Sequence, residues 1–236
     1  MTRILYDLAG ADDCRFSPHC WKSRMALKHK GLDFTTEPCS FLEVKEKVAF
    51  ADWETVPVLS DGSVNVGDSW AIAVYLEETY PDAPSLFGGP DGKAFARFAN
   101  EYANTQLNPL IGGAIVYDIY DHVVDADRDY FRASRQKIIG RSFEELRADR
   151  DSFIARFQAA LAPVRNTIRH QPFMMGDAPS YADYAVFGAL QWIRCSSDCA
   201  MMRPDDPVLA WRDRLLALHD GYAASEPAVG EAAVAA

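Results

Sequence analysis

The sequence has little positive charge, few cysteines and no long hydrophobic run, and each shortage argues against a class of protein. Its 236 residues hold 24 Lys and Arg against 34 Asp and Glu, which gives a formal net charge of −10. Because binding to nucleic acid or to an anionic membrane surface requires basic residues, we expect neither partner. No apolar run approaches the roughly 20 residues that cross a bilayer.

The five cysteines are an odd number, and their spacing does not suggest a disulfide framework. We therefore expect reduced thiols. Cys195 and Cys199 lie four residues apart, but no further His or Cys completes a metal site, so we predict no metal. The first residues lack the basic-then-apolar pattern of a secretory signal, which makes the cytoplasm the expected location.

Residues 1–81 have the pattern of an α/β domain. An apolar strand, a helix and a second strand are followed by two strands joined at Asp61-Gly62, a strong hairpin signal, and by a last helix. The proline- and glycine-rich stretch 82–92 is the expected linker to a second domain.

Residues 93–222 have helical spacing throughout and predict an all-helical domain. One long helix is expected over 93–120, with a kink near Pro109 or Gly112-Gly113. A second long helical stretch is expected over 130–171, with Pro163 starting or kinking its last piece. The Ala-rich residues 223–236 show no helical face, so we expect a disordered tail.

The junction around Ser17 connects the first strand to the first helix. Ser17 is a preferred N-cap residue, and Pro18 suits the first helical position. The hydroxyl would lie at the positive end of the helix dipole beside unpaired backbone N–H groups, where an anion is stabilised. The alternative is that Ser17 only caps the helix.

Four short motifs, taken in order, resemble those of glutathione transferases: the SPHC run at 17–20, Val56-Pro57, Asp68-Ser69 before a helix, and the SYAD run at 180–183. The first is similar to the Cys-Pro-x-Cys of glutaredoxins, with serine in place of the nucleophilic cysteine. The last resembles the capping box of the family's core helix. The resemblance spans nearly the whole chain and implies a thioredoxin-like N-terminal domain followed by an all-α C-terminal domain.

The resemblance also implies roles for individual residues, with glutathione as cosubstrate. Ser17 would donate a hydrogen bond to the glutathione thiolate, the form of the thiol that attacks efficiently. Val56, before a proline that is normally cis in the family, would pair its main chain with the peptide, as an added strand does. Asp68 would bind the γ-glutamyl ammonium, and Ser69 with the helix N-terminus its carboxylate. Alternatively, Pro57 only shapes the entry into a strand, and Asp68 and Ser69 only cap the helix that follows them.

Two runs, 17–31 and 68–76, resemble bacterial glutathione-dependent β-etherases and related fungal enzymes. The expected function is a glutathione transferase that directs the thiolate at a hydrophobic, aromatic electrophile. One alternative is cleavage of lignin-type β-aryl ethers with glutathione, and another is a non-catalytic glutathione- or ligand-binding protein. Glutaredoxin-like thiol exchange is disfavoured because Ser17 replaces the first cysteine. A homodimer is expected from the resemblance alone.

The sequence leaves the other parts of the site open. Lys45 or Lys47 is the nearest candidate for the glycyl carboxylate, although a solvated helix explains both lysines equally well. His19 is a candidate to line the site. Six residues are available for an apolar wall, or belong to the core instead: Phe16, Tyr102, Ile115, Tyr117, Tyr120 and Trp192.

Overall fold

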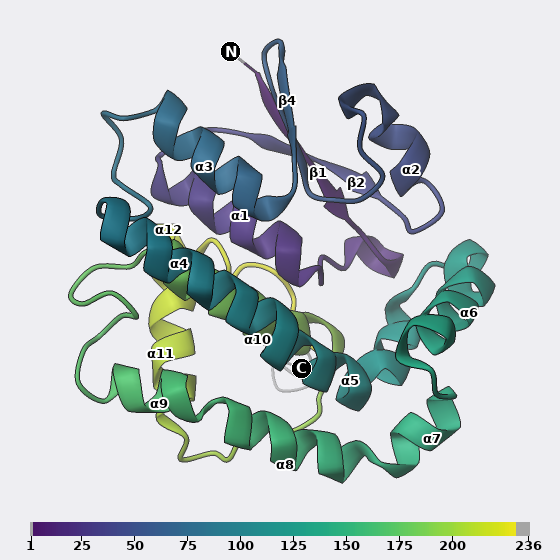
Figure 1. The fold of residues 1–236 in the computed structure, drawn as a ribbon. Coiled ribbons are helices and arrows are strands. Elements are labelled where there is room, and N and C mark those ends of the chain that lie inside the picture. The colour runs from purple at the N-terminus through teal and green to yellow at the C-terminus, as the bar shows by residue number, and fades with distance from the viewer. Residues whose placement is uncertain (1, 230–236) are drawn as a thin grey trace.

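The computed structural model describes residues 2–229 and places a four-stranded sheet with its helices above a group of packed helices (Figure 1). The sheet-bearing part contains, in chain order, β1 (Arg3–Leu8), α1 (Pro18–His29), β2 (Thr35–Cys39), α2 (Val44–Lys47), β3 (Val58–Asp61), β4 (Val64–Gly67) and α3 (Ser69–Thr79). The strand order is β2-β1-β3-β4, in which β1 and β2 are parallel and the other pairs antiparallel. The predicted α/β thioredoxin-like domain followed by an all-α domain is confirmed.

The helical part contains α4 (Pro90–Tyr102), the π-helical turn η3 (Ala103–Leu107), α5 (Asn108–His122), α6 (Arg128–Ile139), α7 (Phe143–Ala148), α8 (Arg150–Ala160), α9 (Ala162–Ile168), α10 (Tyr181–Ser196), α11 (Pro207–Leu216) and the short turn α12 (Leu218–Gly221). Within residues 2–229, no helix is both long and apolar enough to cross a membrane.

Both long helical stretches expected from the sequence are interrupted. The first changes to a π-helical turn before Pro109, which has no backbone N–H to continue the α-helical ladder and instead occupies the first turn of α5. The second ends at Gly140, whose φ of +74° suits glycine. It restarts at Ser142, which forms a capping box with Glu145.

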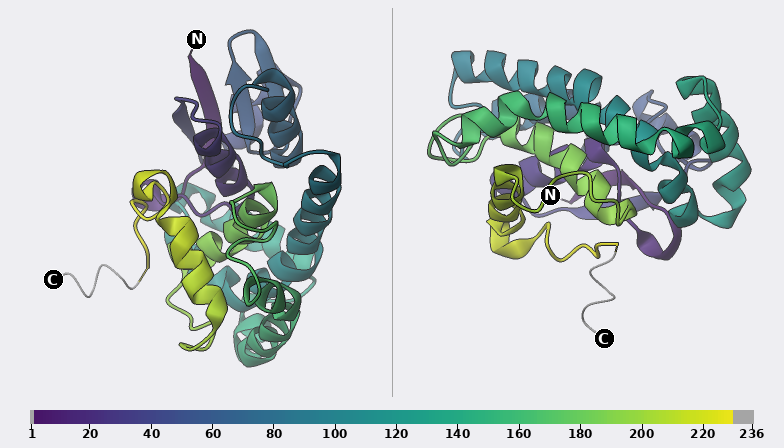
Figure 2. Two further views of the ribbon diagram at one scale, coloured as in Figure 1. Left: turned by 90° about the vertical axis from the view of Figure 1, so that its left-hand side faces the viewer. Right: turned by 90° about the horizontal axis from the view of Figure 1, so that it is seen from below.

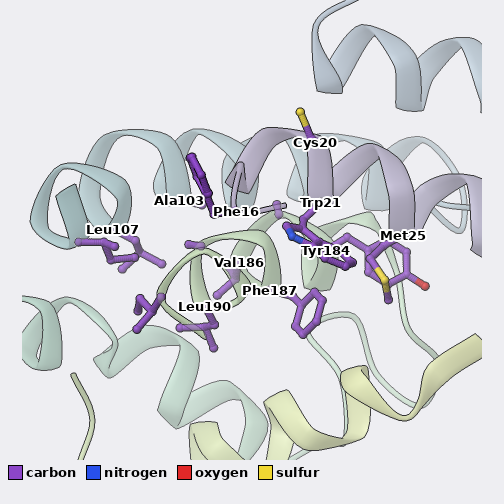
Figure 3. Packing of buried hydrophobic residues seen from close by; sticks show 14 of the residues in the cluster. Phe16, Cys20, Trp21, Met25, Ala103, Leu107, Tyr184, Val186, Phe187 and Leu190 are labelled. Atoms are coloured by element: carbon purple, nitrogen blue, oxygen red, sulfur yellow. The ribbon is translucent and has the colours of Figure 1, made fainter. Parts of the chain in front are cut away.

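The two parts share one hydrophobic core, centred where α1 packs on α10. Trp21 and Met25 of α1 lie against Tyr184 and Phe187 of α10 (Figure 3), and all four side chains are buried. At Gly188 a Cβ atom would lie 2.4 Å from the carbonyl oxygen of Pro18, so only glycine lets α10 approach the first turn of α1 this closely. The start of α1 is thereby held by the helical domain.

The expectation of a disordered tail from residue 223 is wrong for residues 223–229, and residues 230–236 lie outside the described part of the chain. Ala223 is fully buried, and the Glu226 carboxylate accepts hydrogen bonds from Arg24 Nη1 (3.1 Å) and from the backbone N–H of Arg15 (3.2 Å). The left panel of Figure 2 shows α12 lying beside the N-terminal elements just before this segment. Ion pairing with partners distant in sequence, rather than an apolar helical face, orders these residues.

Candidate active site

Three of the sequence-predicted site segments lie at one edge of the sheet. Because β1 and β2 are parallel, their ends at Leu8 and Cys39 share that edge. Because β3 runs antiparallel to both β1 and β4, its first residue, Val58, lies at the same edge as Leu8 and Gly67. The loop to Ser17, the Val56-Pro57 dipeptide and the start of α3 therefore converge there.

Ser17 caps α1 as the sequence predicts. Its backbone is extended, its side chain is buried, and its Oγ accepts a hydrogen bond from the backbone N–H of Cys20 at 3.3 Å. Pro18 follows at the first helical position and contributes no donor. The Ser17 hydroxyl is therefore set at the positive end of the α1 dipole, where it can donate its own proton to an anion.

Asp68 and Pro57 are joined directly. The Val56-Pro57 bond is cis, as the resemblance implied, and the Pro57 carbonyl accepts a hydrogen bond from the Asp68 N–H at 3.2 Å. Asp68 has a φ of +73°, and its Oδ1 accepts from the backbone N–H groups of Trp70 and Ala71, each at 3.0 Å. It is an exposed N-cap whose second carboxylate oxygen carries none of these cap bonds.

Ser69 connects the site to the helical domain. It is buried, and its carbonyl accepts a hydrogen bond from the Tyr181 hydroxyl at 2.9 Å. Tyr181 opens α10 within the predicted capping box of Ser180 and Asp183, which is confirmed. The first turn of α3 is thus fixed against the core helix of the second domain.

Lys22, one turn into α1, is a group that the sequence reasoning missed. It is fully buried, and its ammonium donates to Asn100 Oδ1 (3.0 Å) and Asn104 Oδ1 (2.7 Å) of the helical domain. Burial lowers the Lys22 pKa to about 7, against the attraction of Asp68 and Glu101. The only signal in the sequence is that a lysine occupies a position on the helix face that packs into the core.

His19 lies half-buried in the first turn of α1. Burial and the nearby Lys22 lower its pKa to about 3, so the imidazole is neutral at physiological pH. A contact of this neutral imidazole with a ligand stays a prediction.

The two lysines considered for the glycyl carboxylate both have carboxylate partners. Lys45 Nζ lies 2.6 Å from Glu54 at the exposed surface. Lys47 Nζ lies 3.1 Å from Glu37 and donates to the Pro38 carbonyl at 2.6 Å. Neither is a free cation.

The six candidates for an apolar wall occupy different environments. Phe16 and Ile115 are buried in the core, and the Tyr102 hydroxyl donates to the Ala160 carbonyl. Tyr117 lies beneath the Arg150 guanidinium, 4.3 Å from its ring centroid, while Tyr120 packs edge-on against Phe143 and Trp192 is half-buried. Their contact with an electrophile stays a prediction.

All five cysteines are free thiols. Cys20 is fully buried, which raises its thiol pKa well above the ordinary value, and burial raises that of Cys14 to about 12. Among residues 2–229, no cluster of three or more His, Cys, Asp or Glu is placed to hold a metal ion.

Two family models match the chain: the glutathione S-transferase N-terminal domain over residues 16–79 and the glutathione S-transferase C-terminal domain over residues 94–213. The chain belongs to the glutathione S-transferase family. Members of this family use glutathione, and the edge formed by Ser17, Val56-Pro57 and Asp68-Ser69 lies within the matched N-terminal domain.

Curated relatives differ in how much of the chain they match. A zeta-class glutathione S-transferase of Euphorbia esula is 33% identical over 107 residues, which cover 44% of this chain and 48% of the relative. The chain thus spans about half the length of that relative. A glutathione S-transferase-like protein of Aspergillus flavus is 25% identical over 206 residues, 75% of this chain and 74% of the relative.

Solved structures reproduce the transferase fold over nearly the whole chain. A glutathione transferase from Phanerochaete chrysosporium has a TM-score of 0.77 at 26% identity and covers 95% of this chain and 94% of its own. A glutathione S-transferase of Ceriporiopsis subvermispora in complex with glutathione has a TM-score of 0.79 at 21% identity, with 93% and 97% covered.

Proposed function

We propose that this transferase binds glutathione along the sheet edge and activates its thiol through Ser17. The observation that carries the proposal is the Ser17 N-cap at the edge shared with cis-Pro57 and the Asp68 cap. Val56 would pair its main chain with the peptide. Asp68 would bind the γ-glutamyl ammonium with its carboxylate, and the first turn of α3 at Ser69 would receive the γ-glutamyl carboxylate.

Ser17 acts as a hydrogen-bond donor and not as a base. A serine hydroxyl is too weakly basic to remove the thiol proton, which leaves to solvent. The hydroxyl then donates to the thiolate, helped by the α1 dipole, and lowers the pKa of the bound thiol. Because Pro18 has no backbone N–H, the free backbone donors of α1 begin only after it. The contact to the thiolate therefore comes from the Ser17 side chain.

The electrophile is a hydrophobic aromatic molecule bound by the helical domain. The thiolate forms a C–S bond to the electrophilic carbon, and the leaving group departs with the electron pair of the broken bond. In the β-etherase form of the reaction, that bond is the C–O bond of a β-aryl ether ketone. The phenolate that leaves takes a proton from solvent.

Two electrophiles distinguish the general transferase from the β-etherase. A chloronitroaromatic acceptor and a fluorogenic β-aryl ether ketone are each offered with glutathione. Conjugation without ether cleavage supports the general transferase, which is our first choice, and phenol release with little conjugation supports the etherase. If neither reacts although glutathione binds, the catalytic proposal is wrong and the non-catalytic binding protein takes its place.

We also propose a cytosolic homodimer. The side chains of Phe95 and Phe98 on α4 are 37% and 66% exposed, a large apolar exposure for one helix of a monomer. Location in the cytoplasm stays a prediction.

A further inference from the structure

Arg135 on α6 is a half-buried cation that lacks an anion. Its guanidinium carbon lies 5.1 Å from the ring centroids of both Phe41 and Phe131. No hydrogen bond or ion pair within residues 2–229 engages it. Burial lowers its pKa, and Tyr130 is the neighbour that opposes the shift. Because a desolvated charge is costly unless paired, this arrangement favours the binding of an anion.

The other two arginines of α6 each have a carboxylate partner. Arg132 lies over the rings of Tyr120 (5.4 Å) and Phe143 (5.1 Å), much as Arg135 lies over its own two rings, but its Nη1 is 3.4 Å from Glu144. Arg128 lies 3.2 Å from Asp125. Stacking on aromatic rings therefore does not explain why Arg135 alone of the three has no carboxylate.

The position of Arg135 connects it to the proposed glutathione site. Phe41 follows the end of β2 at the site edge, and its ring centroid is 6.2 Å from that of Phe16, the residue before Ser17. In Figure 1, α6 lies beside the segment between β2 and α2. The contact is fixed by buried Asp127, whose Oδ2 accepts from the Phe41 N–H at 2.5 Å.

Asp127 cannot serve as the missing partner of Arg135. Its two oxygens accept hydrogen bonds from Ser40 Oγ (3.4 Å) and from the backbone N–H groups of Phe41 and Leu42, so they are committed to the loop before α2. The carboxylate holds α6 against the site edge, and the Arg135 guanidinium stays available there.

We propose that Arg135 binds a carboxylate of the ligand held at this edge. The inference rests on the proposed function. A planar guanidinium suits bidentate carboxylate binding, and the flanking phenyl rings shield the pair from water. The carboxylate has two possible sources: the glycyl end of glutathione, for which Lys45 and Lys47 are already paired, or an acidic group on the aromatic electrophile.

Arg135→Gln and the matched control Arg132→Gln test the proposal and separate its two sources. Calorimetry compares glutathione with its glycyl monoethyl ester. Kinetics compare 4-chloro-3-nitrobenzoate with the neutral 4-chloro-3-nitrobenzamide. If the source is the glycyl carboxylate, Arg135→Gln raises the Kd for glutathione about tenfold and leaves that for the ester unchanged. If the source is the electrophile, Arg135→Gln raises the KM for the benzoate about tenfold and leaves the KM for the benzamide unchanged.

Arg132→Gln should match the wild type in all four measurements. The proposal is overturned if Arg135→Gln stays within twofold of the wild type for both acids. It is equally overturned if charged and neutral ligands weaken together, since that pattern marks a purely structural residue. A wild-type protein that binds no glutathione contradicts the proposed function instead, so the two failures are distinguishable.

Discussion

The Lys22 ammonium lies 2.7 Å from Asn104 Oδ1, and this hydrogen bond joins the first helix of the thioredoxin-like domain to the helical domain. Asn100 accepts a second bond from the same ammonium, and the lysine is fully buried. Both partners are neutral amides, so the charge is solvated but not neutralised. Lys22 lies only five residues after Ser17, and its burial therefore links domain packing to the helix that carries the proposed catalytic hydroxyl.

Lys22 should make stability depend on pH between about 7, its pKa in the folded protein, and its ordinary value of 10.5. In that window the unfolded chain binds the additional proton, so the free energy of unfolding rises with pH by up to about 1.4 kcal/mol per unit. Lys22→Met should lose this slope. Urea denaturation at pH 7, 8 and 9 measures it, with the exposed Lys137→Met as control. Parallel slopes for wild type and Lys22→Met would show that the buried ammonium does not titrate there.

Ser17→Ala should lower turnover about tenfold or more and leave glutathione affinity close to the wild-type value. The lost hydrogen bond stabilises the thiolate by about 1.5–3 kcal/mol and contributes little to binding of the rest of the peptide. Loss of the cap should also cost about 1 kcal/mol of stability. Steady-state kinetics with a chloronitroaromatic acceptor, calorimetry and thermal melting separate the three effects. Unchanged turnover would remove Ser17 from the mechanism.

Asp68→Asn and Asp68→Ala should separate capping from ligand binding. The Asn side chain keeps a carbonyl oxygen for the N–H groups of Trp70 and Ala71 and tolerates the positive φ, so only Ala should lose about 1 kcal/mol of stability. Both variants lose the charge that we propose faces the γ-glutamyl ammonium, and both should bind glutathione about tenfold more weakly. If Asp68→Asn binds like the wild type, the carboxylate only caps α3.

Phe98→Glu should disrupt the proposed dimer. Its ring is stacked on Tyr102, with centroids 6.2 Å apart, and most of its surface is open to solvent. A charge in an apolar interface is strongly unfavourable. Light scattering should give twice the 26.3 kDa chain mass for the wild type and the single mass for the variant. A wild-type mass of 26.3 kDa at micromolar concentration would contradict the dimer.

The features predicted from sequence are those that local chemistry determines. The Ser17 and Asp68 caps and the α10 capping box each depend on residues within a few positions of one another. The hairpin between β3 and β4 does so too, but its turn lies at Gly62-Ser63, one residue later than the predicted Asp61-Gly62, because Asp61 still pairs with Val64 at the end of β3. The sheet and the two-domain order followed from such local signals together with the family resemblance.

The features that sequence reasoning missed depend on partners far apart in the chain. Lys22 is buried because Asn100 and Asn104 approach it from another domain. The expected tail is ordered through 229 because Glu226 meets Arg24, more than two hundred residues earlier. In the sequence, Arg135 is one of several charged residues expected on a solvated helix face. Only its contact with the Phe41 ring places it near the proposed site.

Calorimetric titration of the wild type and of Asp68→Asn with glutathione tests most directly the proposal that the sheet edge holding Ser17, Val56-Pro57 and Asp68 binds glutathione. We expect saturable binding to the wild type below millimolar concentration and about tenfold weaker binding to the variant. Absence of binding to the wild type at millimolar glutathione, or equal affinity of the two proteins, would contradict it.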